Sequence, residues 1–305
     1  MHSRLYNFDM KKYLSHYSAV TLWNIPYIEV VLGSEIDKVN RIDMTVSERK
    51  IRSSDANQKI RLCELELPPG AVVSRNGTTV ASPELLFLQL APELSIHRLI
   101  LLGLQLCSYP PGNPSAAITT KEKLETFLAK TLGHRGHRKA LRASKYIEDG
   151  SASIMESVVY MVLTLPNVLG GYGLDGAVFN HEIKPKEEGS NRLGQNRCFA
   201  DLYYKSAKLA VEYESFAFHN SPWGQGKDMI RAATLERQGI DVMRLSTVQL
   251  YNKNSCKDFA FNLARRLGKR IQIRTDKFDQ MHAQLRALMP TAELVDRPEV
   301  REDTT

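Results

Sequence analysis

The stretch Ala200-Asp201-Leu202-Tyr203-Tyr204-Lys205-Ser206-Ala207-Lys208-Leu209-Ala210-Val211-Glu212-Tyr213-Glu214 predicts a β-hairpin, with two apolar, aromatic runs around a polar break. A turn centred on that break places Asp201 directly opposite Glu212. Glu214 shares a face with Glu212, because side chains alternate along a strand. Like charges placed opposite one another destabilise a sheet. A divalent cation such as Mg²⁺, which proteins hold with carboxylates, would offset this repulsion.

The composition is that of a soluble globular chain of 305 residues, with 43% hydrophobic and 25% charged residues and a net charge of +7. The positive balance is compatible with a polyanionic partner. The four cysteines are scattered without a C-x-x-C pair, which argues against a structural zinc site and fits a reducing cytoplasm. The N-terminus lacks the apolar core of a signal peptide. The most apolar run, Leu94–Cys107, is too short to span a membrane, so no membrane partner is expected.

The chain is expected to contain an N-terminal α+β module at 1–115, a basic helical connector at 116–150, a C-terminal domain at 151–290 and a disordered tail at 291–305. The Pro-rich segment 108–115 marks the main break. In the first module, β-rich composition predicts strands at 27–32, 41–46 and 60–67. A hairpin is predicted at 71–80, where Asn76-Gly77 separates two alternating runs.

The C-terminal domain is expected to be α/β, a mixed sheet flanked by helices. A helix at 151–165 carries Glu156 among apolar residues, and it precedes a strand at 177–183 and the hairpin. A helix at 227–238 and a strand at 240–245 follow. Glu156 either contributes to the acidic cluster or lies on an exposed helix face.

This order of elements resembles the PD-(D/E)XK (restriction-endonuclease-like) nuclease superfamily, and within it the domains related to very-short-patch-repair endonucleases. The first half resembles AbiEi-type antitoxins. Together the two resemblances cover most of the chain. The residues that carry the C-terminal likeness are Ala200-Asp201-Leu202, Val211-Glu212-Tyr213-Glu214, His219, Arg231, Leu235, Gly239, Val242, Arg244 and Leu245. Those that carry the N-terminal likeness are Ser18–Leu22, Gly77–Leu90 and Gly133–Leu141.

The resemblance implies a metal site and an acid–base residue. Asp201 and Glu212 would bind Mg²⁺ (or Mn²⁺), and Glu156 would complete the metal shell directly or through water. Glu214 stands where the superfamily usually has Lys, and it would bind a second metal or orient the attacking water. His219 would be a general acid or base near the leaving phosphate. A structural histidine is an equally good interpretation of His219, and edge-strand charges are an alternative for the hairpin acids.

Basic residues are the candidates for contact with nucleic acid. The resemblance places Lys227 and Arg231 on the helix after the hairpin. Independently, the densest basic segment of the chain contains Arg135, Arg138 and Arg142, and Lys and Arg are what phosphates bind. A solvated surface is the alternative for such a charge run.

Two functions from different classes remain open. The first is a Mg²⁺-dependent endonuclease that cleaves or nicks DNA in a defence or toxin–antitoxin context. The second is a non-catalytic DNA-binding antitoxin or repressor that keeps the nuclease fold as a scaffold. A pure protein-interaction module is a third interpretation. A homodimer or a cognate protein partner is compatible with each of them.

Overall fold

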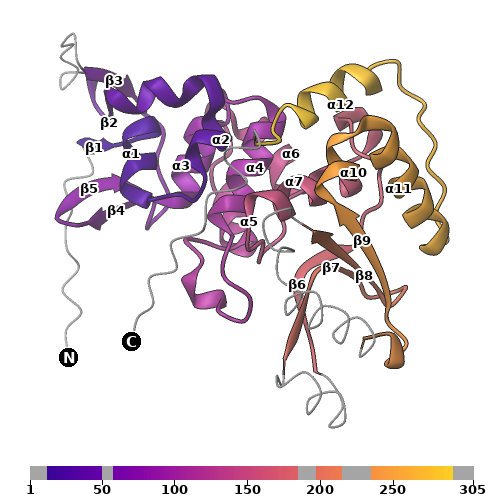
Figure 1. Cartoon of the computed structure of the whole chain (residues 1–305). Helices are drawn as coiled ribbons and strands as arrows, with labels where there is room; N and C mark the ends of the chain where they lie inside the picture. Colours follow the sequence, from indigo (N-terminus) through magenta and orange to yellow (C-terminus); the bar gives the residue numbers. More distant parts are fainter. Residues whose placement is uncertain (1–11, 50–57, 185–196, 215–234, 291–305) are drawn as a thin grey trace. The chain divides into compact units, whose positions relative to one another are not determined.

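The computed structural model describes residues 12–49, 58–184, 197–214 and 235–290, and it divides the chain into two compact units (Figure 1). The first unit comprises Met1–Tyr109 and Ser115–Asp149, and the second comprises Pro110–Pro114 and Gly150–Thr305. The expected connector at 116–150 is therefore wrong as a separate part, because its helices belong to the first unit. The expected tail at 291–305 lies outside the described residues.

The first unit contains a five-stranded mixed sheet in the order β3-β2-β1-β5-β4. Strand β1 is antiparallel to β2 and parallel to β5, while β2 and β3 are parallel. Its strands are β1 (Lys12–Leu14), β2 (Ile42–Val46), β3 (Gln58–Leu62), β4 (Val72–Arg75) and β5 (Thr78–Ala81).

Helices surround the core of the first unit in its described part. Helix α4 is almost wholly buried, so it lies in the centre of this core. The helix after β5 begins with a side-chain cap, because Ser82 Oγ accepts a hydrogen bond from the Leu85 N–H group. The helices are α1 (His16–Trp23), α2 (Ile28–Leu32), η1 (Gly33–Asn40), α3 (Pro83–Leu90), α4 (Ile96–Leu106), η3 (Pro114–Ala116, whose first residue belongs to the second unit), α5 (Lys121–Ala129) and α6 (His137–Ser144).

The strand expected at 27–32 is wrong, because Ile28–Leu32 forms the short helix α2. The β-branched residues of this segment favour a strand locally. In the fold, the Arg98 guanidinium donates hydrogen bonds to the carbonyl groups of Val30 and Val31, at 2.8 and 3.0 Å. This contact satisfies carbonyl groups that a helix end leaves without partners. The strand expected at 60–67 is shorter and earlier, at 58–62.

The second unit contains a four-stranded mixed sheet in the order β6-β7-β8-β9. Strands β6, β7 and β8 are antiparallel neighbours, and β9 runs parallel to β8. Tyr204 pairs with Leu209, so the hairpin has the register that the sequence predicts. The strands are β6 (Ala177–Ile183), β7 (Cys198–Tyr204), β8 (Leu209–Glu214) and β9 (Asp241–Ser246).

Helix α7 (Ile154–Thr164) packs against β7 and β8, and ten of its residues are buried. At its far end, the ring Nδ1 of His282 lies 2.7 Å from the Gly170 carbonyl oxygen, which fixes the last helix to the turn after α7. The described part of this unit also contains η4 (Asn167–Leu169), α10 (Thr247–Tyr251), α11 (Lys253–Arg266) and α12 (Phe278–Arg286).

The chain is therefore a mixed α/β protein with one mixed sheet in each unit. The longest apolar helix of the first unit has 11 residues. Across the described ranges, no helix has the length and apolar character needed to cross a bilayer.

The turn between β4 and β5 offers a test of the first unit's local sequence. Asn76 and Gly77 have φ values of 50° and 75°, as a tight hairpin turn requires. A Cβ atom at Gly77 would meet no other atom within 4 Å, so substitution costs only backbone strain. We expect Gly77→Ala to destabilise the protein by about 1 kcal/mol, and Gly77→Asn to cost less, because Asn tolerates this conformation. Thermal unfolding of both variants measures this, and equal stability of Gly77→Ala and the wild type would contradict it.

Candidate functional site

Four polar residues form a row across the sheet of the second unit, one from each strand. The register pairs Phe179 with Leu202 and His181 with Ala200, which places Asn180 opposite Asp201. The β7–β8 pairing ends at Leu202 and Val211, and the next position of the same register is that of Asp201 and Glu212. Glu212 is in turn the Cα partner of Arg244 on β9. The row is Asn180, Asp201, Glu212 and Arg244.

The backbone ladder between β7 and β8 ends at this row. Its last pair is Leu202 and Val211, one residue short of the two acids. Beyond it, Asp201 Oδ2 accepts a hydrogen bond from the Tyr213 N–H group at 2.8 Å. The carboxyl group therefore takes the place of a backbone acceptor, and this fixes one of its oxygens.

Glu156 lies near this row, in the first turn of α7. Its Oε1 accepts a hydrogen bond from Ser153 Oγ at 3.1 Å, and its Oε2 accepts one from the Ala152 N–H group at 3.0 Å. Ser153 Oγ in turn accepts the Glu156 N–H, the S-x-x-E arrangement that begins many helices. Glu156 is partly buried, so the alternative of an exposed helix face is wrong. It has a helix-capping role whatever else it does.

The protonation of Glu156 is coupled to Asp201. Burial and the nearby Asp201 carboxylate raise the pKa of Glu156 to about 8, although three hydrogen-bond donors oppose the shift. Two carboxyl groups that repel each other in a partly buried place favour a shared proton or a bound cation. Glu156 and Asp201 therefore lie close enough for their carboxyl groups to interact electrostatically.

Asn180 is a member of the site that the sequence reasoning missed. Its side-chain amide donates hydrogen bonds to Glu156 Oε2 at 2.7 Å and to the Gly150 carbonyl oxygen at 2.9 Å. Its φ is 41°, an unusual value within a strand that Asn adopts more readily than most residues. The signal in the sequence was a lone Asn in an otherwise apolar half-strand.

Glu214 has a cationic neighbour. Its carboxylate forms an ion pair with Arg244 Nε at 3.3 Å, and both side chains are partly exposed. Arg244 was recognised in the sequence only as part of the resemblance. In the structure it lies beside both hairpin acids of β8, so the row carries a guanidinium group as well as carboxylates.

Carboxylate oxygens are the ligands that Mg²⁺ prefers, and Mg²⁺ is usually held by one or two carboxylates together with waters and substrate phosphates. Asp201 and Glu156 fit this pattern, since their mutual repulsion would be relieved by a cation. Among the side chains that the structure describes, no group of three or more His, Cys, Asp or Glu comes close enough to form a metal site. The expected set of three acids is thus not assembled as one cluster there.

The expected nucleic-acid contacts divide between two groups. Arg135, Arg138 and Arg142 are exposed, and they belong to the first unit, whereas the acids belong to the second. Arg138 and Arg142 lie four residues apart on α6, as expected. His219, Lys227 and Arg231 lie outside the described residues.

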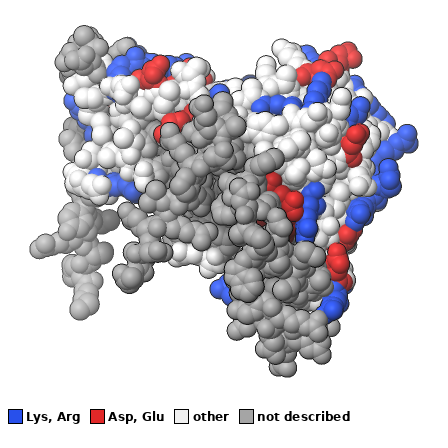
Figure 2. All heavy atoms as spheres, viewed as in Figure 1, with Lys and Arg blue, Asp and Glu red and all other residues white. Residues whose placement is uncertain are grey.

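The surface of the second unit carries charges of both signs. Figure 2 shows Lys and Arg side chains along the edge where Figure 1 draws α11, with acidic side chains among them. Two members of this basic set are already in ion pairs, Arg266 with Asp241 and Lys269 with Asp175. This part of the surface therefore favours the solvated interpretation over a uniform phosphate-binding face.

Comparison of the chain with protein-family models, with curated proteins and with solved structures found no match. The two resemblances stated above therefore rest on the residues alone.

The raised pKa of Glu156 predicts how stability depends on pH. Between its ordinary value of 4.5 and about 8, the folded protein holds a proton that the unfolded chain has lost. Stability in metal-free buffer should therefore fall with rising pH through this window, by about 1.4 kcal/mol per pH unit at most from this group. Glu156→Gln should flatten the decline.

Urea unfolding at a series of pH values measures this dependence. Glu125→Gln, at an exposed position on α5, is the matched control and should keep the wild-type slope. A Glu156→Gln variant with an unchanged pH slope would contradict the prediction.

Proposed function

We propose that the second unit is a Mg²⁺-dependent nuclease that hydrolyses phosphodiester bonds of nucleic acid, with DNA as the expected substrate. The observation that carries the proposal is the pairing of Glu156 with Asp201 at the row of polar residues across the sheet. Like charges are costly in such a place. A site that tolerates them, and fixes each with hydrogen bonds from backbone or amide groups, is suited to a divalent cation.

Each residue of the row has a role in the proposed reaction. Asp201 and Glu212 would hold Mg²⁺, and Asn180 orients the Glu156 carboxyl group by its 2.7 Å hydrogen bond. When bound, Mg²⁺ lowers the pKa of a coordinated water and neutralises charge on the phosphate. Without a cation, Glu156 holds a proton near neutral pH, because burial and Asp201 raise its pKa to about 8.

Arg244 bears on the position where the resembled superfamily has Lys. Glu214 itself cannot supply a positive charge to a phosphate. The Arg244 guanidinium, 3.3 Å from the Glu214 carboxylate, places such a charge beside it. Arginine recognises phosphate through several N–H donors, so this ion pair is compatible with a phosphate on the same side of the sheet.

The finer identity is part of the same proposal. The order α7-β6-β7-β8-β9, with β9 parallel to β8, is compatible with a restriction-endonuclease-like domain. We further propose that Arg138 and Arg142 contact the DNA backbone, that the protein acts in the cytoplasm, and that it serves a defence or toxin–antitoxin system. A homodimer or a cognate protein partner would be compatible with that role.

A second candidate is a non-catalytic DNA-binding regulator. The observation that favours it is the Glu214–Arg244 ion pair. In this pair Glu214 partly neutralises the guanidinium charge of Arg244 that the reaction would use. Glu156 also has a purely structural capping role at the start of α7. If this alternative holds, the protein binds DNA in a salt-dependent manner, and no divalent metal supports cleavage.

Asp201→Asn separates these candidates. The asparagine oxygen can still accept the Tyr213 N–H group, so the strand end should persist while the charge is lost. We expect cleavage of supercoiled plasmid with Mg²⁺ to fall by about 100-fold or more, comparable to the loss of a main electrostatic contact in an active site. Thermal unfolding checks that the variant is folded.

Asp258→Asn, at an exposed position on α11, is the matched control and should cleave as the wild type does. Equal cleavage by wild type and Asp201→Asn would rule out the proposed site. Salt-dependent binding to DNA without cleavage by the wild type, with Mg²⁺ or Mn²⁺, would instead favour the regulator.

A further inference from the structure

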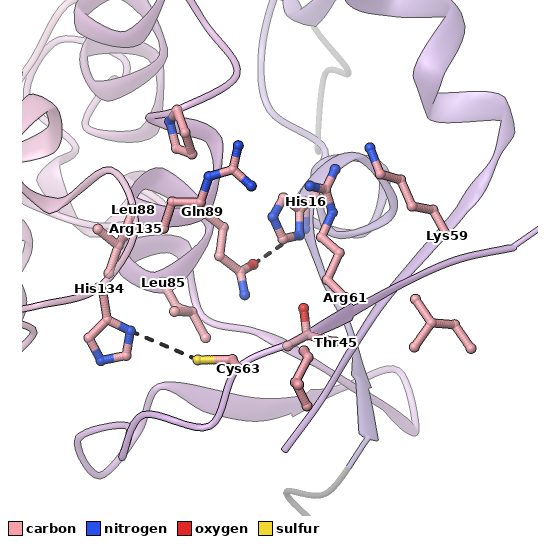
Figure 3. A pocket seen from close by; sticks show the side chains of 13 residues that line it. His16, Thr45, Lys59, Arg61, Cys63, Leu85, Leu88, Gln89, His134 and Arg135 are labelled. Atoms are coloured by element: carbon pink, nitrogen blue, oxygen red, sulfur yellow. Dashed lines mark hydrogen bonds between the residues drawn. The ribbon is translucent and has the colours of Figure 1, made fainter. Parts of the chain in front are cut away.

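A cavity of about 400 Å³ lies within the first unit, remote in sequence from the acids of the second. Figure 3 shows the side chains around it, most of which come from β2, β3, α3, the start of α1 and the turn before α6. This volume is in the range of cavities that bind small organic molecules.

The wall of the cavity carries positive charge. Lys59, Arg61 and Arg135 line it, and none of the described residues that line it is Asp or Glu. His16 lies among these cations. Burial, followed by the charges of Arg61, Lys59 and Arg135, lowers the pKa of His16 to about 2, so it is neutral. Three cations therefore act on one part of the wall.

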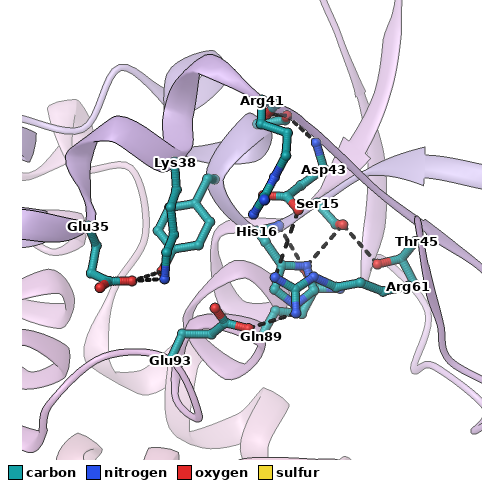
Figure 4. Close-up of polar contacts among 12 residues, drawn as sticks. Ser15, His16, Glu35, Lys38, Arg41, Asp43, Thr45, Arg61, Gln89 and Glu93 are labelled. Carbon is teal, nitrogen blue, oxygen red and sulfur yellow. Dashed lines mark hydrogen bonds and ion pairs between the residues drawn. The ribbon is translucent and has the colours of Figure 1, made fainter. Parts of the chain in front are cut away.

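One of the three cations already has acidic partners. Figure 4 shows Arg61 with its Nη1 2.6 Å from Glu93 Oε1, and its Nη2 lies 3.8 Å from Oδ1 of the buried Asp43. Burial raises the pKa of Asp43, while the pair with Arg61 lowers the pKa of Glu93 against the effect of its own burial. Glu93 therefore offsets the Arg61 charge.

The other two cations are free to bind a ligand. Within the described ranges, neither Lys59 nor Arg135 makes an ion pair or a hydrogen bond through its side chain. Their charges lie at a cavity wall from which acidic side chains are excluded. Such a wall selects for an anion with about two negative charges.

The turn that carries Arg135 is held in place. Gly136 has a φ of 86°, and a Cβ atom there would lie 2.6 Å from Pro92 Cδ, so the turn packs closely on the end of α3. On one side His134 Nε2 lies 3.3 Å from the Glu66 carbonyl oxygen, and on the other His137 Nε2 lies 2.8 Å from that of Leu128. Arg135 is thus presented by a fixed segment.

Another part of the cavity wall is apolar. Leu85 and Leu88 of α3 line it, together with Ile60, Leu62 and Pro92. Gln89 adds an amide beside His16. Its Oε1 accepts a hydrogen bond from the backbone N–H group of His16, with an N···O distance of 3.3 Å. A ligand that fits both sides has an anionic group at one end and a less polar body at the other.

We propose that this cavity binds a nucleotide through its terminal phosphomonoester, with Lys59 and Arg135 on the phosphate and the body against Leu85 and Leu88. A phosphomonoester carries between one and a half and two negative charges at neutral pH, which matches the two available cations. Guanidinium and ammonium groups are the usual phosphate ligands. The site is independent of the proposed nuclease site, since it needs neither its acids nor a metal.

Isothermal titration of the full chain with AMP in EDTA tests the proposal. AMP should bind, and adenosine should bind about tenfold or more weakly, because it lacks the charged group. Lys59→Gln and Arg135→Gln should each weaken AMP binding about tenfold. Lys123→Gln, at an exposed position on α5, should bind as the wild type does, and Lys59→Arg should retain binding.

Two further titrations identify the source of the phosphate. The first uses a short oligodeoxynucleotide with and without a 5′-phosphate. If only the phosphorylated form competes with AMP, the site is assigned to a nucleic-acid end. If inorganic phosphate competes with AMP and neither oligonucleotide does, the site is assigned to a free nucleotide. The proposal is overturned if the wild type binds neither AMP nor phosphate nor the phosphorylated oligonucleotide. It is also overturned if the folded double variant Lys59→Gln, Arg135→Gln binds AMP as the wild type does. Because EDTA is present, neither result depends on nuclease activity.

Discussion

The candidate site of the second unit depends on the electrostatic conflict between Glu156 and Asp201. Each carboxyl group is fixed by a separate part of the fold. Helix α7 holds Glu156 through the Ala152 and Ser153 hydrogen bonds, and the end of the β7–β8 ladder holds Asp201 through the Tyr213 N–H group. Neither can rotate away without losing these bonds. The repulsion is therefore built into the packing of α7 on the sheet, and a proton or a cation is what relieves it.

In the first unit the uncompensated charge around the cavity is positive rather than negative. There Arg61 is set against Glu93 and the buried Asp43, so acids compensate one of the three cations around the cavity. In each unit, charges of one sign exceed those of the other around one site. In the second unit the surplus is negative and would favour a cation, whereas in the first unit it is positive and would favour an anion.

Local sequence was sufficient for the parts of the fold that local physics determines. The polar break after Tyr204 set the register that opposes Asp201 and Glu212, and Asn76-Gly77 set the tight turn in the first unit. The sequence-based predictions that failed depend on contacts between residues far apart in the chain. Helix α2 was mistaken for a strand because its carbonyl groups are satisfied by Arg98, which lies 68 and 67 residues away from them in sequence. Asn180 was missed because its partner Glu156 lies 24 residues earlier, on a different element.

The left-handed backbone of Asn180 places a double restriction on one position of β6. Its φ of 41° disfavours most side chains other than that of Asn, β-branched ones above all, and the hydrogen bond to Glu156 requires a side-chain donor. Glycine would meet the first condition alone, and glutamine would meet the second but adopts this backbone conformation less readily than asparagine. Sequence variation at this position is therefore expected to be far narrower than at Phe179 or His181, its neighbours along the strand. Asparagine satisfies both conditions at this point of β6.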